Sequence, residues 1–374
     1  MPSFAEVFDV KVTTRAVSRV AATGSSLLRL FGMQSESPTI RRINGRDFSY
    51  DIFNASRSVA TGRGPGAPAA TVNLQPTGRV SGTLPRLNEK MILPYEKLNI
   101  VRRMGTANEI DEAGLDYTRD QQTILGQRAA NFRLLQLAGM MRGKLYAHQS
   151  GEDIYYDFTS SSSAFNIDWQ IPSGNLLRLN MLGGGNIIDK SWADPTADIP
   201  GHAAAIRSAI VQLTGRDVRI AMCGLTMWEY IKGNDNVQAK SGIASVVFES
   251  VPLPPGVEAD SNGQPISAYR LSGIPELTWI VTDQGLTLGS SGSTYTKLVG
   301  DTDVWFGPAP NVNQFQMHEG SETVVVRNNP TLARGLFAWT KQTDDPAAVL
   351  MYTVDNVLIA NYVPAATAYA TPIF

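Results

Sequence analysis

The residue types that most often bind metals or act as nucleophiles are scarce in this sequence. It contains three histidines, His148, His202 and His318, and one cysteine, Cys223. A zinc site needs three or four such ligands at short spacings, and no His-Glu-x-x-His or Cys-x-x-Cys motif is present. We therefore expect the histidines to be surface or hydrogen-bonded residues. We expect Cys223, at the end of an apolar segment, to be a small core residue.

A glycine-rich segment at residues 62–68 is the feature closest to a phosphate-binding loop. It reads Gly-Arg-Gly-Pro-Gly-Ala-Pro and lacks the Gly-Lys-Ser/Thr ending of such loops, and its prolines have no backbone N–H to face an anion. A flexible loop tip is the better interpretation. There is no Gly-x-Ser-x-Gly elbow, and nothing in the sequence favours a Ser-His-Asp triad assembled by the fold. These residues predict no catalytic site, no metal and no cofactor.

Charge is low along the whole chain. Of 374 residues 18% are charged and the net charge is −2, whereas ordinary soluble domains contain ~25% charged residues. A near-neutral chain does not suit a protein whose main task is coating phosphate backbones. Because interface cores are depleted of charged residues, the deficit favours a protein largely covered by other subunits. The pairs Arg41/Arg42 and Arg102/Arg103 are interpreted as subunit contacts or a solvated face.

The sequence has no feature of a membrane or secreted protein. Its apolar runs, of which residues 134–141 are typical, are far shorter than the ~20 residues of a spanning helix. Residues 1–11 contain no apolar signal-peptide segment. The single cysteine cannot form an intramolecular disulfide. We expect a protein of the reducing cytoplasm with no membrane partner.

The first 93 residues divide into an arm and a long ribbon. Residues 1–45 show no sustained period and are predicted to form an arm that packs on another surface. In residues 46–93, apolar and polar residues alternate on both sides of the 62–68 segment, which is the period of β-strands. Two strands of ~15 residues would reach ~50 Å, and an isolated hairpin is only marginally stable. We therefore expect this ribbon to need another surface to lie on, which a compact fold of this size would rarely supply.

Residues 108–142 carry the clearest helix signal. Asn108 is a suitable N-cap, and acidic residues crowd the first turns while basic residues follow later, which complements the helix dipole. An apolar stripe at helical spacing runs from Ile110 to Ala138. Such a helix would be ~50 Å long. Its glycines are interpreted as bends or positions of close packing, and they are Gly114, Gly126 and Gly139.

Strands and one mixed α/β segment make up the rest of the chain. Strands are expected at 154–158 and 165–171, followed by Gly183, Gly184 and Gly185, which suit a hinge. Residues 186–319 mix helices and strands, and the final segment is again rich in strands. Helices are predicted at 200–214 and 225–239, and strands at 218–222, 266–271, 277–281, 302–306, 323–326, 336–341 and 348–362.

The order of these elements and three local stretches carry a resemblance to a known family. The first stretch closes the long helix with Ala138-Gly139-Met140-Met141-Arg142-Gly143-Lys144-Leu145. The second is Trp192-Ala193-Asp194-Pro195-Thr196-Ala197-Asp198-Ile199, which suits a turn into a helix anchored by a buried tryptophan. The third is the strand–helix unit at 218–232 with Trp228. Over residues 27–374 the chain resembles the major capsid protein of tailed bacteriophages, and within it the lambda-type protein, also called the capsid protein E family.

The resemblance implies an α+β tailed-phage major capsid fold. Its parts would be an N-terminal arm (1–45), an extended β-hairpin loop (46–93), a peripheral domain with the spine helix (94–185 and 320–374) and an α/β axial domain (186–319). The axial-domain motif would consist of Trp192, Asp194, Pro195, Thr196 and Asp198. Subunit contacts would involve Arg63, Pro65, Arg79, Arg41, Arg42, Arg102 and Arg103. Domain rotations would use Gly183, Gly184, Gly185, Gly126 and Gly139.

The implied function is assembly rather than catalysis. Copies of the chain would form hexamers and pentamers of an icosahedral shell around double-stranded DNA, with the DNA in weak, non-specific contact. Further partners would be a portal, a separate scaffolding protein and, as often in this family, a decoration protein. The protein would reside in the virion after assembly in the host cytoplasm. Three alternatives stay open: an encapsulin-type shell protein of the same fold, an enzyme with an α/β core at 186–319, and a tail or baseplate structural protein.

Overall fold

The computed structural model describes most of the 374-residue chain. The described residues are 4–23, 25–33, 37–52, 78–98, 100–101, 109–150, 153–158, 165–177, 187–239, 248–253, 266–288, 294–311, 313–326, 328–344 and 347–373. The α-helices in these ranges are α1 (Phe4–Val7), α2 (Val10–Thr23), α3 (Ser26–Leu30), α4 (Tyr95–Leu98), α5 (Glu112–Arg142), α6 (Ile199–Thr214), α7 (Leu225–Lys232) and α8 (Asp235–Ala239). None of them is long and apolar enough to cross a membrane.

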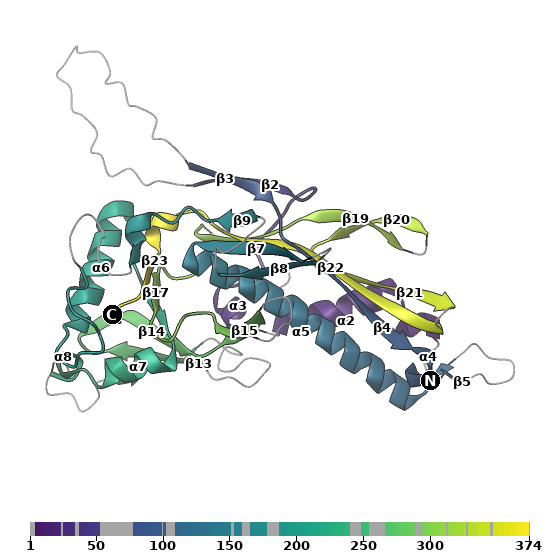
Figure 1. Cartoon of the computed structure of the whole chain (residues 1–374), viewed down its shortest axis with the longest axis horizontal. Helices are drawn as coiled ribbons and strands as arrows, with labels where there is room; N and C mark the ends of the chain where they lie inside the picture. The colour runs from purple at the N-terminus through teal and green to yellow at the C-terminus, as the bar shows by residue number, and fades with distance from the viewer. Residues whose placement is uncertain are drawn as a thin grey trace, which may run out of the picture.

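Two regions make up the body (Figure 1). One contains α6, α7, α8 and a seven-stranded sheet, and the other contains the long helix α5 and a five-stranded sheet. The seven-stranded sheet has the order β10 (Leu176–Leu177), β23 (Ala368–Ala370), β17 (Val304–Gly307), β11 (Ile220–Cys223), β14 (Ile274–Thr282), β13 (Ile266–Leu271) and β12 (Phe248–Ser250). The five-stranded sheet consists of β1 (Ile40–Arg42), β18 (Phe315–Glu319), β22 (Ala347–Asn361), β21 (Phe337–Asp344) and β4 (Arg86–Pro94).

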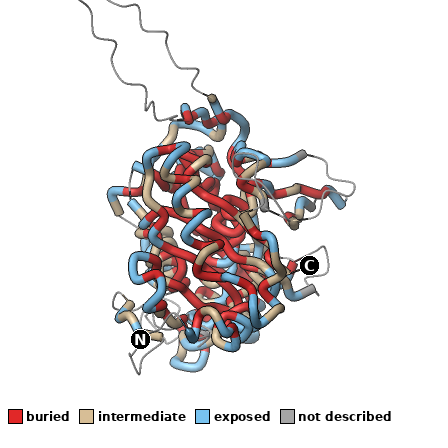
Figure 2. The backbone as a smooth tube through the Cα atoms, turned by 90° about the vertical axis from the view of Figure 1, so that its left-hand side faces the viewer, coloured by how far each residue is buried: buried red, intermediate tan, exposed pale blue. Residues whose placement is uncertain are grey.

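Smaller sheets cover or extend the second region. A three-stranded sheet has the order β8 (Asp153–Asp157), β7 (Lys144–Ser150) and β9 (Phe165–Asp168). Four antiparallel pairs complete the described strands: β2 (Asp47–Ile52) with β3 (Gly78–Thr83), β5 (Ile100–Val101) with β6 (Glu109–Ile110), β15 (Gly285–Leu288) with β16 (Thr294–Lys297), and β19 (Ser321–Val326) with β20 (Asn329–Arg334). Buried residues fill the interior of the body, and exposed residues lie at its periphery (Figure 2).

The spine helix is present and continuous, but it begins later than predicted. Asp111 is the N-cap, and its carboxylate accepts a hydrogen bond from the Gly114 N–H at 2.7 Å. The predicted start at residue 108 was wrong because Glu109 and Ile110 pair with β5 instead. The helix ends where Gly143 adopts a left-handed conformation with φ 87°. Its 31 residues span about 46 Å.

The apolar stripe expected on the spine helix is not the buried face of its first half, where the buried residues are Gly114, Thr118, Gln122, Leu125 and Gly126. Ile124, counted in the stripe, is 41% exposed. Every residue from 132 to 141 is buried, so the second half of α5 has no polar face. The reason is that α2 and β22 both contact this helix, and β7 and β23 contact it as well. A helix buried on all sides shows little amphipathic pattern in its sequence.

The N-terminal segment is helical, which the sequence pattern did not indicate. The buried face of α2 consists of Thr13, Val17 and Ala21. These residues are four apart, as on one face of a helix, but two of the three are small or polar. A search for large apolar residues at helical spacing therefore does not find this helix. The helix packs against α5 and β21.

The ribbon predicted over residues 46–93 is correct in part. β2 and β3 pair antiparallel from Asp47↔Thr83 to Ile52↔Gly78, as the alternation predicted. Residues 86–94 do not continue the ribbon, because β4 pairs with β22 inside the five-stranded sheet. The tip at residues 62–68 lies outside the described residues. The part of the ribbon formed by β2 and β3, here called the ribbon root, lies along one side of the body (Figure 1).

Most other predicted elements are confirmed with small shifts. The helix expected at 200–214 is α6, and the strands expected near 220, 268, 279, 304, 324, 339 and 355 are β11, β13, β14, β17, β19, β21 and β22. The helix expected over 225–239 is divided into α7 and α8, since Gly233 ends the first and the Asn234 side chain accepts a hydrogen bond from Val237 N–H at 3.0 Å. β23, in the segment assigned to the peripheral domain, pairs with β17 of the other sheet.

Candidate assembly surfaces

The root of the ribbon is anchored on the subunit's own body. Along β2 buried and exposed residues alternate, and Phe48, Tyr50 and Ile52 are each at most 5% exposed. On the exposed side Arg79 forms an ion pair with Asp51 at 3.0 Å, and both side chains are more than half exposed. A pair this exposed contributes little to folding. Arg79 therefore lies at the ribbon root with its charged group exposed.

An aromatic and histidine cluster fixes this root to β18 and to the end of β22. The Tyr50 ring lies 5.6 Å from the His318 ring in an edge-on arrangement and 5.2 Å from the Tyr362 ring. The His318 Nε2 atom is 2.9 Å from the Tyr362 hydroxyl, which in turn donates to the Gln316 side chain. Burial raises the pKa of Tyr50. Burial, with a smaller contribution from the Arg41 charge, lowers the pKa of His318 to about 4.

The two arginine pairs predicted as subunit contacts have different outcomes. Arg41 and Arg42 lie on β1, which pairs in parallel with β18. Arg41 donates a hydrogen bond to the Tyr362 hydroxyl at 3.3 Å, so part of its role is inside the subunit. Both side chains are nevertheless exposed. Arg102 and Arg103 lie outside the described residues, as do Arg63 and Pro65.

A buried ionic cluster joins the spine helix to the five-stranded sheet. The Arg133 guanidinium, 4% exposed, donates to the Asp355 carboxylate at 2.8 and 3.3 Å and to the Glu319 carboxylate at 3.1 Å. Burial by itself would lower the pKa of Arg133, but the two carboxylates outweigh it and the pKa is raised. Burial raises the pKa of Glu319 despite the nearby arginine. Sequence reasoning treats Arg133 only as one of the basic residues that complement the helix dipole.

The spine glycines occupy positions of close packing. A Cβ atom added to Gly126 would lie 2.5 Å from the Val20 Cβ of α2. One added to Gly139 would lie 2.9 Å from the Leu145 Cβ and 3.0 Å from the Trp169 ring. These approaches support the packing interpretation, while a hinge role for either glycine stays a prediction. Gly183, Gly184 and Gly185 lie outside the described residues.

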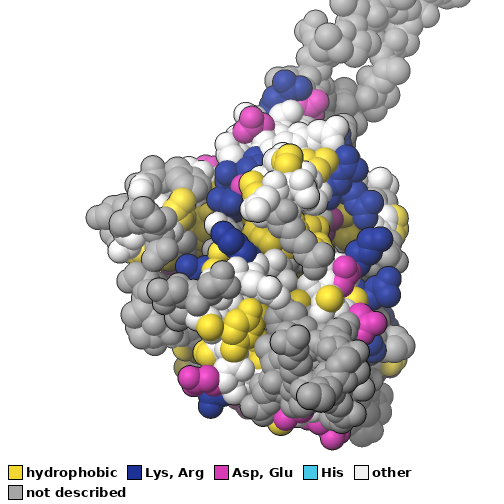
Figure 3. Space-filling view, turned by 90° about the vertical axis from the view of Figure 1, so that its right-hand side faces the viewer, with side chains coloured by type: hydrophobic (Ala, Val, Ile, Leu, Met, Phe, Trp, Pro, Cys, Tyr) yellow, Lys and Arg dark blue, Asp and Glu magenta, His cyan; other side chains and the backbone are white. Residues whose placement is uncertain are grey.

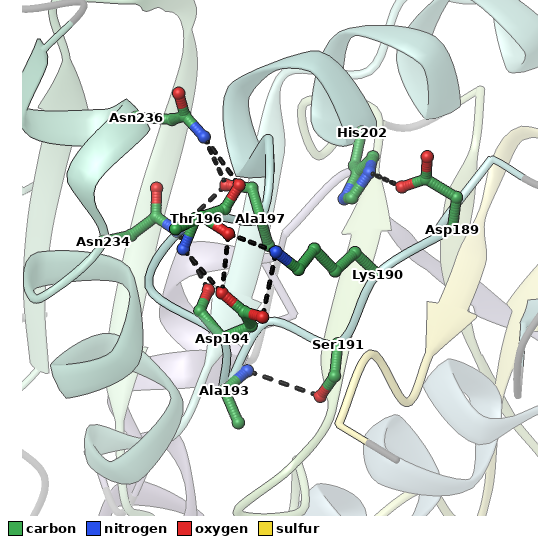
Figure 4. Close-up of polar contacts among 10 residues, drawn as sticks. All are labelled: Asp189, Lys190, Ser191, Ala193, Asp194, Thr196, Ala197, His202, Asn234 and Asn236. Carbon is green, nitrogen blue, oxygen red and sulfur yellow. Dashed lines mark hydrogen bonds and ion pairs between the residues drawn. The ribbon is translucent and has the colours of Figure 1, made fainter.

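The axial-domain motif forms a compact turn before α6 (Figure 4). The Asp194 carboxylate accepts hydrogen bonds from the Thr196 N–H and hydroxyl, both at 2.8 Å, and pairs with Lys190 at 2.9 Å. Lys190 also contacts the Thr196 hydroxyl. These donors, Lys190 first, lower the pKa of Asp194 to about 2. Asn236 donates to the carbonyl of Thr196 at 2.9 Å, so the start of α8 holds the turn.

Trp192 anchors this turn in the core. It is 1% exposed, and its indole N–H donates to Nδ1 of His202 at 3.0 Å. His202 must then carry its proton on Nε2, which donates to the Asp189 carboxylate at 2.8 Å. Asp198 caps α6 by accepting from the Gly201 N–H at 3.1 Å, as the sequence predicted. The motif is thus a structural corner of the subunit.

The histidines and the cysteine have the environments expected from the sequence. His148 Nε2 forms a hydrogen bond to the Asp157 carboxylate at 2.9 Å, and all three histidines are buried and hydrogen-bonded. Cys223 is fully buried, and burial raises its pKa, which disfavours the reactive thiolate. Within the described residues there is no group of three or more His, Cys, Asp or Glu side chains that could hold a metal ion.

The hairpin of β19 and β20 presents an apolar face that the sequence did not single out. Val325 is 65% exposed and Leu332 is 51% exposed. The register pairs Thr323 with Leu332 and Val325 with Pro330, so these side chains share one face of the hairpin. The opposite face, with Val324 and Val326, is buried. The hairpin stands at the edge of the body (Figure 1).

A broad groove lies beneath the ribbon root. Its volume is about 1420 Å³, and residues of β3, β4, α5, β8 and β9 line it. The cations on its wall are Arg46, Arg79, Arg86 and Arg128. Arg128 is held by Glu89 at 2.5–2.8 Å. On the side of the molecule that forms the right of Figure 1, Lys and Arg side chains gather along one edge and apolar side chains lie nearer the centre (Figure 3).

Comparisons with known proteins identify the fold. No protein-family model and no curated protein matches the chain. A prophage protein from Escherichia coli, provisionally assigned as a capsid protein, superposes with a TM-score of 0.51 at 15% identity over 79% of this chain and 79% of that chain. A phage-related protein from Bordetella bronchiseptica superposes with a TM-score of 0.50 at 11% identity over 100% of this chain and 98% of that chain. The chain has the α+β fold of phage capsid proteins, as the sequence predicted.

Proposed function

We propose that this chain is a major capsid subunit, and that its copies assemble into a closed icosahedral shell around the double-stranded DNA genome of a tailed phage. The observation that carries the proposal is the fold, shared over 79% of both chains with a prophage protein provisionally assigned as a capsid protein. The low charge of the chain, 18%, adds support because interface cores are poor in charged residues. The proposal gives the chain no catalytic role and no cofactor.

In the proposed shell, the ribbon reaches from its anchored root across a neighbouring subunit. The burial of Tyr50 and Ile52 supports this arrangement, since a root fixed on its own body directs the ribbon before the neighbour binds. A preorganised segment loses less conformational entropy on docking. Arg79 is then a contact at the root, and the sequence-based candidates Arg63, Pro65, Arg102 and Arg103 belong to the same proposal, together with Arg41 and Arg42.

The apolar face of the β19–β20 hairpin is a second proposed contact between subunits. Val325, Pro330 and Leu332 form an exposed apolar surface on a protruding element. Such a surface is stabilised when another subunit covers it. Each contact is modest in size, and closure of a shell repeats it many times, so avidity makes the assembly stable.

The finer features follow from the family resemblance. The subunits would form hexamers and pentamers, with residues 186–319 clustered around the five-fold and six-fold centres. Gly183, Gly184 and Gly185 would act as a hinge between the domains. Portal, scaffolding and decoration proteins would be partners, assembly would take place in the host cytoplasm, and the lambda-type family would be the nearest group.

Expression of the full chain followed by negative-stain microscopy tests the proposal. We expect icosahedral particles or capsomers, and a stable monomer that catalyses a reaction would contradict the proposal. Deletion of residues 62–68 should impair particle formation and leave the subunit folded. Normal particles from this deletion would contradict the role assigned to the ribbon.

A pair of substitutions tests the hairpin contact separately. Val325→Asp combined with Leu332→Asp should reduce the yield of particles without changing the circular dichroism of the subunit. The matched control is Ile124→Asp, since Ile124 is 41% exposed on α5 and no contact is assigned to it. Equal particle yields from the two variants would refute the hairpin contact.

A further inference from the structure

The charge of the N-terminal helical segment differs from that of the chain as a whole. The whole chain has a net charge of −2. Residues 10–33 contain four cationic residues, Lys11, Arg15, Arg19 and Arg29, and no Asp or Glu. None of the subunit contacts proposed above uses these four cationic residues.

Three of these cations form a stripe on α2, here called the α2 stripe: Lys11, Arg15 and Arg19. All three are exposed, and their spacing of four residues places them on one face of the helix, about 6 Å apart along its axis. The opposite face, with Thr13, Val17 and Ala21, is buried. Lys11 and Arg15 form no ion pair with the described residues.

Contacts on the inner face fix the direction in which the α2 stripe points. The Thr14 hydroxyl donates to the Ala338 carbonyl at 2.7 Å and accepts from the Ala338 N–H at 3.1 Å. The Thr14 hydroxyl therefore satisfies both the N–H and the C=O of Ala338, which point away from β22. Val20 fills the space that Gly126 leaves on α5. The helix cannot rotate about its axis without losing these contacts.

We propose that the α2 stripe binds the phosphate backbone of nucleic acid. The three cations extend over about 12 Å, and a DNA strand, with a phosphate every ~3.4 Å along the axis, presents about three phosphates over that length. Contacts to phosphates do not depend on the base sequence, and each one is weak. A shell would repeat them in every subunit. The identity of the ligand as a packaged genome rests on the proposed function.

The composition of the stripe favours a nucleic acid over an acidic protein segment. A protein partner is normally held by buried aromatic or aliphatic anchors at the centre of its interface. The only large apolar side chain exposed on α2 is Val12, at 50%. Charge alone, evenly spaced, is what a phosphate backbone requires.

Binding of a labelled DNA duplex to the full-length, unassembled subunit tests the proposal. Three phosphate contacts predict that affinity falls about 40-fold between 50 and 200 mM salt. Replacement of the stripe by K11Q, R15Q and R19Q should remove most of this salt dependence, so that the loss of affinity relative to the wild type is about 40-fold larger at 50 mM than at 200 mM salt. The control R219Q, K232Q and R270Q changes the net charge equally in the other region, and it should bind like the wild type.

The remaining outcomes also decide the question. Equal loss of affinity in the control, or no binding by the wild-type subunit at 50 mM salt, would overturn the proposal. Stripe-dependent binding of polyglutamate as tight as that of DNA would assign the stripe to an acidic protein instead. Microscopy of the same variants separates this result from the proposed function: loss of particles with DNA binding intact would make the stripe an assembly contact and would also overturn the proposal.

Discussion

Acid should destabilise the folded subunit through His318. The ring is completely buried beneath Tyr50 of the ribbon root, and its Nδ1 atom has no hydrogen-bond partner among the described residues. Protonation would place a charge on a ring that is shielded from water, and the nearby Arg41 guanidinium on β1 would repel that charge. The native state therefore resists protonation.

The magnitude follows from the pKa difference. The ordinary pKa of 6.5 falls to about 4 in the folded state. A group with a depressed pKa in the native state stabilises that state fully above its unfolded pKa, and the stabilisation is lost as pH falls toward the folded value. At ~1.36 kcal/mol for each pH unit, the loss between pH 6.5 and pH 4 is about 3 kcal/mol.

Urea unfolding of the unassembled subunit measures this loss. The free energies of unfolding of the wild type and of His318→Gln are compared at steps from pH 7.5 to pH 4, so that all other titrating groups cancel. We expect the difference between the two proteins to change by about 3 kcal/mol across this window. His148→Gln, which removes a histidine that hydrogen-bonds to a carboxylate, serves as the control. Parallel curves for wild type and His318→Gln would refute the reasoning.

Three further predictions concern the contacts that hold α5 and the turn before α6, each measured by urea unfolding. Asp355→Ala leaves a buried guanidinium without its main partner and should cost about 3–5 kcal/mol, whereas Glu319→Gln, where burial already disfavours the charge, should cost less than about 1 kcal/mol; equal costs would contradict this difference. Gly126→Ala forces a methyl group against α2 and should lower the free energy of unfolding by about 1–3 kcal/mol. An unchanged free energy of unfolding would contradict the close packing of α2 against Gly126. Trp192→Phe removes a buried donor and should cost about 1–3 kcal/mol, and an unchanged midpoint would argue against that hydrogen bond.

The parts of the fold that could be predicted from the sequence are those with strong local signals. β13 and α6 were located within a residue or so because alternating residues, a cap at Asp198 and a glycine stop at residue 215 specify them locally. The long helix was found for the same reason. Its first turn was misplaced because Asn108 and Asp111 are both good caps, and the pairing of β6 with β5 decides between them.

The residues that hold the candidate surfaces together could not be found in this way. Arg133 and Asp355 are 222 positions apart, and nothing near either one indicates that they meet. Thr14 and Ala338 are 324 positions apart. On a helix, Arg133 looks like any solvent-facing cation, and only the burial of residues 132–141 on all sides turns it into a core residue. Pairing between distant strands, such as β4 with β22, was missed for the same reason.

The short strand β18 joins the ribbon root to the spine helix. Successive residues of a strand point to opposite faces, so His318 contacts Tyr50 of the ribbon on one face while Glu319 reaches Arg133 of α5 on the other. β1 pairs with Met317, His318 and Glu319 of this strand, and its Arg41 donates a hydrogen bond to the Tyr362 hydroxyl. The ribbon root is therefore part of the subunit core and not an appended hairpin. If a neighbouring subunit binds the ribbon as proposed, it contacts an element already ordered by folding, so the entropy cost of ordering the root belongs to folding and not to assembly.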